Sequence, residues 1–411
     1  MMNFLKKIIL EQEGFIYKYL LSPISLINNN KNYTNIFSYI IRNDIAYFAH
    51  YKYAIYFDNE DPSAVLQIDK WFNNNFFNKE DTIVLFRIYS SSLVQHTRFL
   101  EKNKYNFYAF KVLKYFDLSQ SNIKYIFYPF NSFTNPVLIK YRNIKHIWIT
   151  HGESDKLASV NPMIKMYDYM FVAGDVAVKR LKAYSIVNEC DMKNNRVIKI
   201  GLPYVKKTQI KSSVKELKKI LYAPTWEGVE TEQQYSSLNN NWGIKVLEEF
   251  LTEYDVEISF QPHPSTGIKN KKYIKYVNNV INTFKNSKNF TLIIDKNSFI
   301  YNYIQCNNIS DSNIEYSEFD FVFTDNSSII ANLIFYKMNY LVLLNNKNID
   351  FKRAFLLSIS SILTKRESLF NIINKELGMD KKLRYSQVID DKYSTLKEII
   401  TLIEENNETN I

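Results

Sequence analysis

The sequence predicts an α/β protein made of two halves, each a parallel β-sheet with helices on both faces. Short apolar runs alternate with longer amphipathic stretches, a pattern typical of parallel strands that are connected through helices. The 411 residues are more than one ordinary domain needs. Gly201-Leu-Pro203 ends a first series of apolar runs, and a second series begins after the charged stretch from Lys206 to Lys219.

Seven apolar runs predict the strands of the first half. They are Ala54–Phe57, Thr82–Arg87, Phe107–Val112, Tyr125–Tyr128, Lys145–Thr150, Tyr169–Val172 and Val197–Ile200. Ahead of them, MMNFLKKIIL is interpreted as the first helix of the fold. An interfacial membrane helix is the alternative, although Glu11 and Glu13 interrupt its apolar face. The segment lacks the apolar region and cleavage site of a signal peptide.

Five further runs predict the strands of the second half. They are Ile220–Ala223, Val256–Phe260, Phe290–Ile294, Phe319–Phe323 and Tyr340–Leu344, with helical patterns at Trp242–Glu253, Lys272–Lys285 and Ser327–Tyr336. The amphipathic tail from Tyr393 to Glu405 predicts a last helix that packs on a domain face. We therefore expect domains at residues 1–205 and 206–390, followed by a C-terminal helical segment at 391–411.

Composition limits the class of ligand and compartment. The net charge of +10 and the pI of about 9.1 favour acidic ligands such as nucleotides, phosphorylated polymers or an anionic membrane face. No basic run is interleaved with aromatics as in known nucleic-acid-binding modules, so nucleic acid is not an expected partner. Cys190 and Cys306 are too few for a disulfide framework or a cysteine-based zinc site, and they fit a reducing cytosol. No apolar run approaches the roughly 18 residues of a transmembrane helix.

The stretch Ile149–Lys156, ITHGESDK, carries the first candidate site. It follows an apolar run, so His151 and Gly152 are expected where a strand ends, which is where ligands bind in α/β proteins. Histidine suits proton transfer near neutral pH, and glycine lets a substrate or second backbone come close. The alternative is that His151 has only a structural role, with its ring hydrogen-bonded in the turn after the strand. A second histidine in an equivalent place in the other half, His263, favours function.

A phosphate-binding helix start is predicted at Phe323–Ile330, FTDNSSII. A buried strand ends at Phe323, and Asp325 or Asn326 is a good N-cap for the helix that follows. Ser327 and Ser328 then fall in the first helical turn, beside free backbone N–H groups and the positive end of the helix dipole. Two hydroxyls there can hold a phosphate without a glycine-rich loop, and simple capping is the alternative.

Two more strand ends of the second half carry constrained polar residues. In Phe260-Gln-Pro-His-Pro264, the flanking prolines restrict the direction of the His263 ring. In Tyr222-Ala-Pro-Thr-Trp226, Thr225 can donate to phosphate and Trp226 can contact a base, or be only a core aromatic at a turn. Since the carboxyl ends of parallel strands share one edge, these residues and the paired serines are expected to converge.

Taken in order, the segments HGESDK, GLP, YAPTW, HP and TDNSS resemble the CDP-glycerol glycerophosphotransferase family, which includes teichoic acid primases, teichoic acid polymerases and capsule polymerases. The resemblance covers roughly residues 145 to 345. It implies a GT-B-like fold, in which two Rossmann-like domains with parallel sheets face each other across a cleft. The domain at 1–205 would bind the acceptor and the domain at 206–390 the nucleotide donor.

The resemblance also implies that the protein is bacterial, and it implies an activity. The family transfers an alditol phosphate, most often glycerol phosphate, from a CDP-alditol to a hydroxyl of a lipid-linked or polysaccharide acceptor in cell-envelope polymer synthesis, and releases CMP. By resemblance, His151 is the general base and His263 meets the donor pyrophosphate. The implied donor-binding and phosphate-binding residues are Gly152, Lys156, Thr225, Trp226, Pro264, Asp325, Ser327 and Ser328. Asp325 would cap or orient the loop before the serines.

The expected partners follow from this activity. They are a CDP-alditol, the acceptor and the inner membrane surface, so a cytoplasmic protein attached peripherally to the cytoplasmic face of the cell membrane is expected. No cofactor is expected. No metal is expected either, because no Asp-x-Asp pair stands at a strand end and Asp58-Asn-Glu-Asp61 is interpreted as a solvated turn.

Departures from the family pattern leave alternatives open. Glu153-Ser154 stand where Thr-Pro is common, Asn326 where Tyr is usual, and Tyr204–Lys207 where a polar Arg-Asn-Asp stretch is usual. These changes leave the alditol and the acceptor undetermined. A GT-B glycosyltransferase that uses a nucleotide sugar for capsule or lipopolysaccharide is the second hypothesis. A non-catalytic polyanion-binding or membrane-binding protein is the third.

Overall fold

The computed structural model describes most of the chain from residue 45 onward. The described residues are 45–59, 61, 64–87, 93–110, 117–150, 152–207, 216–228, 235–287, 289–296, 298–310, 314–344, 353–364, 367–393 and 395–408. The chain divides into two compact units. Unit 1 comprises Met1–Leu66 and Asn78–Lys145, and unit 2 comprises Gln67–Phe77 and His146–Ile411. The helix predicted at MMNFLKKIIL, with Glu11 and Glu13, lies outside the described residues.

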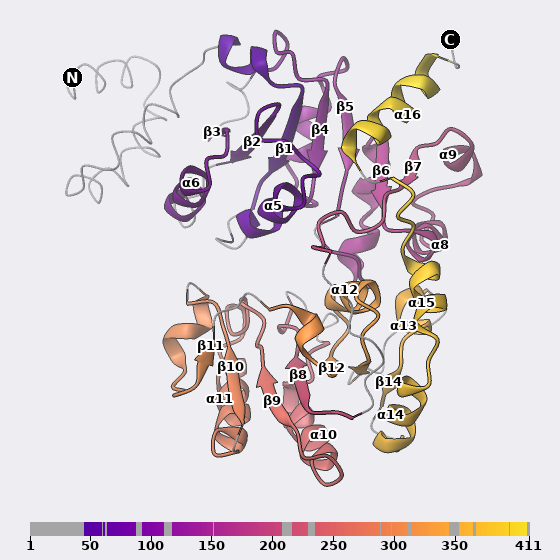
Figure 1. The fold of residues 1–411 in the computed structure, drawn as a ribbon. Coiled ribbons are helices and arrows are strands. Elements are labelled where there is room, and N and C mark those ends of the chain that lie inside the picture. Colours follow the sequence, from indigo (N-terminus) through magenta and orange to yellow (C-terminus); the bar gives the residue numbers. More distant parts are fainter. Residues whose placement is uncertain are drawn as a thin grey trace, which may run out of the picture. The chain divides into compact units, whose positions relative to one another are not determined.

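Unit 1 holds a parallel β-sheet with strands in the order β3-β2-β1-β4 (Figure 1). Its described elements are η2 (Ile45–His50), β1 (Tyr53–Phe57), β2 (Thr82–Arg87), α6 (Leu93–Lys102), β3 (Phe107–Phe110), β4 (Tyr125–Tyr128) and α7 (Asn135–Leu138), and α5 (Ala64–Asn73) begins in it. Ile55 pairs with Val84 on one side and with Phe127 on the other. All five residues of β1 are buried, as expected for a parallel strand covered on both faces.

One expectation for unit 1 is wrong, and it concerns Asp58, which lies directly after β1. Its side chain is only 4% exposed, accepts a hydrogen bond from the Thr134 hydroxyl and forms an ion pair with Arg87 at 3.5 Å. The interpretation of residues 58–61 as a solvated turn is therefore wrong for Asp58. A buried carboxylate needs partners that offset its lost hydration, and these come from segments distant in sequence.

Unit 2 begins with three strands in the order β5-β6-β7. Its elements up to residue 199 are β5 (Lys145–Trp148), which starts at the last residue of unit 1, η4 (Leu157–Val160), η5 (Pro162–Met166), β6 (Tyr169–Val172), α8 (Asp175–Ala183), α9 (Glu189–Lys193) and β7 (Val197–Lys199). Met170 in β6 pairs with Trp148 in β5 and with Val197 in β7. These strands place residues 149–150 and 152–156 after the carboxyl end of β5, and residues 173–175 after that of β6.

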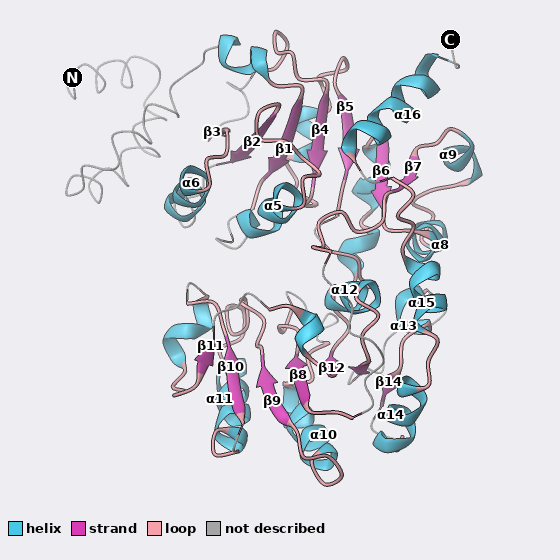
Figure 2. Ribbon diagram, viewed as in Figure 1, coloured by secondary structure: helices cyan, strands magenta, loops and turns pink. Residues whose placement is uncertain are grey.

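The rest of unit 2 contains a seven-stranded parallel sheet in the order β11-β10-β9-β8-β12-β13-β14 (Figure 2). Its strands are β8 (Lys219–Ala223), β9 (Glu257–Phe260), β10 (Phe290–Ile293), β11 (Ile309–Ser310), β12 (Phe321–Thr324), β13 (Tyr340–Leu343) and β14 (Ile362–Leu363). The order reverses at β8, which pairs with β9 on one side and β12 on the other. This reversal is a topological switch point, where ligands bind in open α/β sheets.

Helices connect and cover these strands. They are η7 (Asn239–Asn241), α10 (Trp242–Phe250), α11 (Lys272–Phe284), η8 (Phe299–Tyr303), η9 (Tyr316–Glu318), α12 (Ile329–Phe335), α13 (Phe355–Ser358), α14 (Leu369–Leu377), α15 (Lys381–Val388) and α16 (Leu396–Glu408). Leu247 of α10, Val277 of α11 and Ile373 of α14 belong to one buried apolar cluster with the sheet. That cluster fixes the strand ends that carry the candidate site.

The predicted α/β class with parallel sheets is confirmed, and most element limits move by only one or two residues. The strand expected at Lys145–Thr150 ends at Trp148, and the helix expected at Trp242–Glu253 ends at Phe250. The strands β11 and β14 were not predicted, because two residues each give no recognisable pattern. The amphipathic tail forms α16, with Ile399, Ile400 and Ile403 buried on one face. The domain limits at 205 and 390 stay predictions.

The segment after α15 packs closely on the carboxyl end of β6. The Asp390 N–H donates to the Ala173 carbonyl at 2.9 Å, and the Lys199 ammonium lies 3.4 Å from the Asp390 carboxylate. A Cβ atom on Gly174 would lie 2.4 Å from the Val388 carbonyl oxygen. Only glycine therefore allows this approach of two backbones.

We expect Gly174→Ala to destabilise unit 2, because its methyl group would push the backbone at Val388 away. Overpacking of this kind costs about 1–3 kcal/mol. Thermal unfolding followed by circular dichroism would show a lower midpoint. Gly378→Ala is the matched control, since a Cβ there would find its nearest neighbour at an ordinary 3.6 Å. Equal midpoints for the two variants would contradict the close approach.

Candidate functional site

The candidate site is built where β8 and β12 end side by side at the switch point. Thr324 pairs with Ala223, and the Thr324 hydroxyl donates to the Ala223 carbonyl at 2.9 Å. The chain beyond β8 therefore leaves the sheet next to the chain beyond β12. This confirms that the YAPTW and TDNSS segments share one sheet edge, as the parallel arrangement predicts.

Asp325 joins the two segments. Its side chain is fully buried, and Oδ2 accepts hydrogen bonds from the backbone N–H of Thr225 at 2.8 Å and of Ser237 at 3.1 Å. Desolvation raises the pKa of Asp325 to about 7, although these hydrogen bonds and the charge of Lys156 act in the opposite direction. Among the described residues, its other oxygen, Oδ1, is buried without a hydrogen-bond partner.

The helix after β12 starts later than predicted. The structure places the N-cap of α12 at Ser328 and the first helical residue at Ile329, so Asp325 and Asn326 are not N-caps. The prediction was wrong because the Asp325 carboxylate bonds to amides of the neighbouring segment instead of to its own helix. Ser327 and Ser328 accordingly precede the first turn. The buried Ser327 hydroxyl accepts from the Ile329 N–H at 3.1 Å, while Ser328 is exposed.

Lys156 brings a cation to this sheet edge. Its ammonium donates to the Thr225 hydroxyl at 2.9 Å, which links the loop after β5 to the loop after β8. Burial lowers the pKa of Lys156 to about 8, against the opposing charge of Asp325. The ammonium of this half-buried lysine bonds to a neutral hydroxyl and is offset only in part by the charge of Asp325, so an anion placed beside it would be attracted.

Gly152 lies against Ser328. A Cβ atom at residue 152 would be 2.6 Å from the Ser328 Cβ and 2.9 Å from its Oγ. The Gly152 N–H donates to the Thr150 hydroxyl at 2.9 Å, and that hydroxyl donates to the Gly152 carbonyl at 2.7 Å. We expected Gly152 to let another group come close, and the group that does so is the Ser328 side chain of the TDNSS segment.

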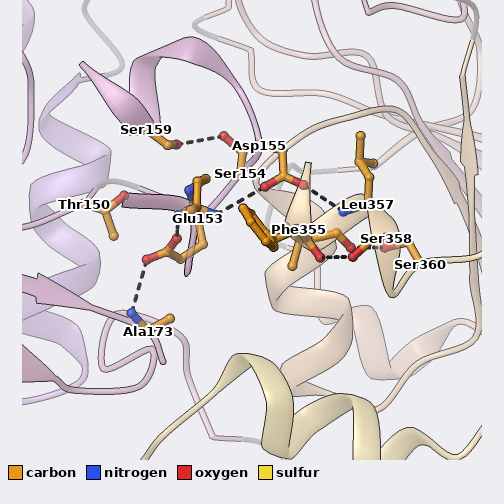
Figure 3. Close-up of polar contacts among 12 residues, drawn as sticks. Thr150, Glu153, Ser154, Asp155, Ser159, Ala173, Phe355, Leu357, Ser358 and Ser360 are labelled. Atoms are coloured by element: carbon orange, nitrogen blue, oxygen red, sulfur yellow. Dashed lines mark hydrogen bonds and ion pairs between the residues drawn. The ribbon is translucent and has the colours of Figure 1, made fainter. Parts of the chain in front are cut away.

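A buried ionic network holds the loop that follows Gly152 (Figure 3). Arg180 of α8 donates to the Glu153 carboxylate and to Asp155 at 3.4 Å. The Ala173 N–H donates to Glu153 at 3.2 Å, and the Leu357 N–H donates to Asp155 at 2.7 Å. All three charged side chains are at most 3% exposed. Desolvation raises the pKa of Asp155, although Arg180 opposes this shift.

The departures from the family pattern at Glu153 and Ser154 have a local structural cause. The Glu153 carboxylate accepts from Arg180. It also accepts from the Ala173 N–H, and the Ser154 hydroxyl lies 3.2 Å from the Ser159 hydroxyl (Figure 3). Both side chains are buried and already partnered. They fix the loop in place, so the change from Thr-Pro at these positions gives no information about the transferred group.

His263 is fixed in orientation by two contacts. Its Nδ1 accepts a hydrogen bond from the Ser265 N–H at 3.1 Å, and its ring stacks on the Trp226 indole at 5.9 Å between centroids and 18° between planes. Because Nδ1 accepts, a neutral ring carries its proton on Nε2. His263 can therefore present an N–H donor without being charged. Pro264 beside it is exposed.

Glu227 anchors the loop that carries His263, and the sequence did not single it out. Its buried carboxylate accepts from the backbone N–H groups of Gly267, Lys269 and Asn270 at 3.0–3.1 Å. Gly267 has a φ of +86°, a conformation that side chains disfavour. An acidic residue directly after YAPTW was a usable signal. So was Arg180, a basic residue on the apolar face of its helix.

The structure thus brings Gly152, Lys156, Thr225, Asp325 and Ser328 together through direct contacts. Trp226 and His263 form a stacked pair that is joined to this group through the peptide bond after Thr225. The predicted base, His151, lies outside the described residues. Asn326 is buried, and its Oδ1 has no hydrogen-bond partner within the described part of the chain.

No group of three or more His, Cys, Asp or Glu side chains in the described ranges is arranged to hold a metal ion. Within the same part of the chain, every helix is too short or too polar to span a membrane.

Comparisons with known proteins support the fold. No family model matches the chain, and no curated protein matches it. Among solved structures, a putative UDP-N-acetylglucosamine 2-epimerase from Listeria monocytogenes aligns with a TM-score of 0.50 and 13% identity, over 88% of this chain and 97% of that one. The wall teichoic acid polymerase TagF aligns with a TM-score of 0.45 and 14% identity, over 100% and 99%. MurG of Acinetobacter baumannii aligns at 0.42 and 9%, over 86% and 99%.

These similarities lie at low sequence identity and show the fold alone. The expected GT-B-like class, with parallel α/β sheets, is confirmed by the chain's own strand order together with the epimerase alignment. The reaction and the substrate do not follow from a shared fold, because unrelated functions occur on the same architecture.

We expect Gly152→Ala to disturb the site, because the added methyl group would collide with the Ser328 side chain. The cost is about 1–3 kcal/mol. A lower thermal midpoint would reveal it, and the double variant Gly152→Ala/Ser328→Gly should recover the part of the loss that the collision causes, while the strain of an alanine at a φ of +158° remains. Failure of the second substitution to restore stability would contradict the contact.

Proposed function

We propose that this chain is a transferase that moves an alditol phosphate from a CDP-alditol to a hydroxyl of a lipid-linked or polysaccharide acceptor and releases CMP. Glycerol phosphate is the first candidate for the transferred group. The observation that carries the proposal is the Lys156 ammonium held on the Thr225 hydroxyl at the switch point, beside the segment with Ser327 and Ser328. A half-buried cation among hydroxyls at this edge suits a diphosphate.

Neutral hydrogen-bond donors complement this cation in the proposed donor site. Ser327 and Ser328 supply hydroxyls from the segment after β12. His263 supplies an Nε2–H, because the Ser265 N–H occupies its other nitrogen. Donors that are fixed before the substrate arrives stabilise developing charge without reorganisation, and each can contribute about 10²–10³-fold to the rate. Trp226, stacked on His263, offers its indole as a wall for the donor.

The proposed step is an in-line phosphoryl transfer. The acceptor hydroxyl oxygen forms a bond to the phosphorus that carries the alditol, and the bond from that phosphorus to the bridging oxygen breaks. CMP leaves with the bridging oxygen and the electron pair of that bond. The proton of the hydroxyl goes to His151, the base that the sequence resemblance implies, and from there to solvent. A base in this position contributes about 10²–10⁴-fold.

A nucleotide-sugar glycosyltransferase is the second candidate. Asp325 Oδ1 and Asn326 Oδ1 are buried acceptors without partners among the described residues, and Asp325 also interacts with the Lys156 charge. Such oxygens favour a ligand with several hydroxyl groups, and a sugar has more of these than glycerol. Both candidates use a diphosphate nucleotide at the same sheet edge, so only the identity of the accepted donor separates them.

We expect purified protein with CDP-glycerol and acceptor to release CMP, and His263→Ala or His151→Ala to lower the rate by about 10²-fold or more, because each removes a group from the reacting centre. Chromatography of the nucleotides would measure CMP. CDP-ribitol and a panel of sugar nucleotides should be tested in parallel, since turnover of a sugar nucleotide instead would select the glycosyltransferase.

His50→Ala is the matched control for the histidine variants. His50 is an exposed histidine in η2, and its loss should leave the rate unchanged. Wild-type rates in both His151→Ala and His263→Ala would remove the proposed chemistry. Salt-sensitive binding of polyanions that is indifferent to both histidines, with no turnover of any donor, would instead indicate a non-catalytic binding protein.

Donor binding should weaken as the pH rises through about 8. The pKa of Lys156 in the free protein is about 8, so its charged fraction falls about tenfold between pH 7 and pH 9. The charge of a CDP-alditol does not change over this interval, and the Kd measured by calorimetry should therefore rise by up to about tenfold. Asp325, whose pKa is about 7, also becomes negatively charged over this interval, and this charge further weakens the binding of an anionic donor.

Two variants separate these titrations. Lys156→Arg keeps a cation at every pH in the interval and should remove the step near pH 8. Asp325→Asn removes the carboxylate charge and should leave the step near pH 8 in place. A wild-type Kd that is constant from pH 7 to pH 9 would exclude Lys156 as a donor-binding cation.

A further inference from the structure

Unit 1 presents one phenylalanine almost completely to solvent. Phe133, in the loop between β4 and α7, is 95% exposed, the largest value among the exposed large hydrophobic residues in the described part of the chain. Val137 follows four residues later at 41% exposure, and Pro136 between them is also exposed. The phenylalanine stands directly before the N-cap of α7, Thr134, and the valine lies in this short helix, so two exposed apolar side chains lie within five residues of the chain.

The loop holds this side chain outward. The Ser132 hydroxyl donates to the Asp58 carbonyl at 2.8 Å, and the Thr134 hydroxyl donates to the Asp58 carboxylate. The buried Asn135 side chain donates to the Phe130 carbonyl at 2.7 Å. Both chain neighbours of the exposed phenylalanine are therefore tied to Asp58 through their side chains.

The surrounding sequence is basic and lacks acids. Residues 118–145 contain no Asp or Glu and carry Lys124, Lys140, Arg142 and Lys145. Lys140 and Arg142 are exposed, and Lys140 follows the end of α7 by two residues. The whole chain has a net charge of +10. This segment is thus complementary to an anionic surface.

We propose that residues 132–142 dock on an anionic phospholipid surface. Phe133 and Val137 would enter the boundary between headgroups and acyl chains, while Lys140 and Arg142 bind lipid phosphates. A specific protein partner fits less well, because stable protein interfaces bury roughly 800 Å² on each side and two projecting side chains supply far less. A lipid surface needs no such shape-matched area, since each inserted side chain contributes separately.

The proposal deepens the proposed function, on which it rests for its biological setting, because a lipid-linked acceptor lies in such a surface. Vesicle binding, however, is measured without donor or acceptor. If a variant loses vesicle binding but still releases CMP with a water-soluble acceptor, the docking surface is affected and the reaction is not. If the protein binds vesicles but turns over no donor, the proposed reaction is wrong and the docking surface is unaffected.

The test uses the full chain and sedimentation with vesicles of phosphatidylglycerol and phosphatidylcholine. Phe133→Ala should weaken binding about tenfold, because one aromatic ring no longer leaves water. Leu383→Ala is the matched control, an exposed leucine in α15 of unit 2 at 57% exposure, and should bind as wild type does. Since Phe133 is fully solvated, its substitution should leave the thermal midpoint unchanged.

Lys140→Gln/Arg142→Gln should remove most of the preference for phosphatidylglycerol over pure phosphatidylcholine and reduce the weakening by salt. Equal vesicle binding by wild type and Phe133→Ala would overturn the proposal. So would a change of solution mass in Phe133→Ala by analytical ultracentrifugation without vesicles, which would identify a second copy of the chain as the occupant. Residues 1–44 are present in every variant, so any contribution from them cancels in these comparisons.

Discussion

The Asp325 carboxylate is the interaction on which the candidate site depends. A fully buried carboxylate is costly unless it is hydrogen-bonded and balanced by charge. Here the amides of Thr225 and Ser237 supply the bonds and Lys156 supplies the charge. Because those two amides belong to the chain after β8, the carboxylate fixes that chain against β12. The order of the whole switch point follows from one side chain whose partners lie about one hundred residues away.

A second buried network depends on the same geometry. Lys156 reaches Thr225 only because the preceding loop is held, and Asp155 holds it through Arg180 and the Leu357 amide. The loop after β5 is thereby attached to both α8 and α13 next to the position of the lysine. Loss of Arg180 would leave two buried carboxylates unbalanced, which costs several kcal/mol. Under the proposed function, the residue that anchors the loop, Asp155, and the residue that binds the donor, Lys156, are therefore adjacent in the chain.

The sequence was sufficient for the strands and for the edge at which the motifs meet, because buried parallel strands are continuous apolar runs and their carboxyl ends share one side. It was not sufficient for side-chain partners. Asp325 looked like a helix cap, since local sequence favours capping, yet the tertiary fold offered it amides from another segment. The partners of Glu227 could not be predicted for the same reason, because residues 267–270 adjoin it only after folding.

Under the proposed function, the balance of charge explains why the donor site combines the Lys156 cation with neutral hydrogen-bond donors. A CDP-alditol diphosphate carries two negative charges, and Lys156 with a pKa of about 8 supplies one positive charge at neutral pH. The Nε2–H of His263 and the serine hydroxyls can share the remaining charge without adding another cation. CMP leaves with two negative charges on one phosphate, whereas the donor carries one on each of two phosphates, and a site with several cations would slow the release of this product. Dipolar donors stabilise the transferring phosphate while leaving product release possible, so one poised lysine suits turnover better than a basic cluster.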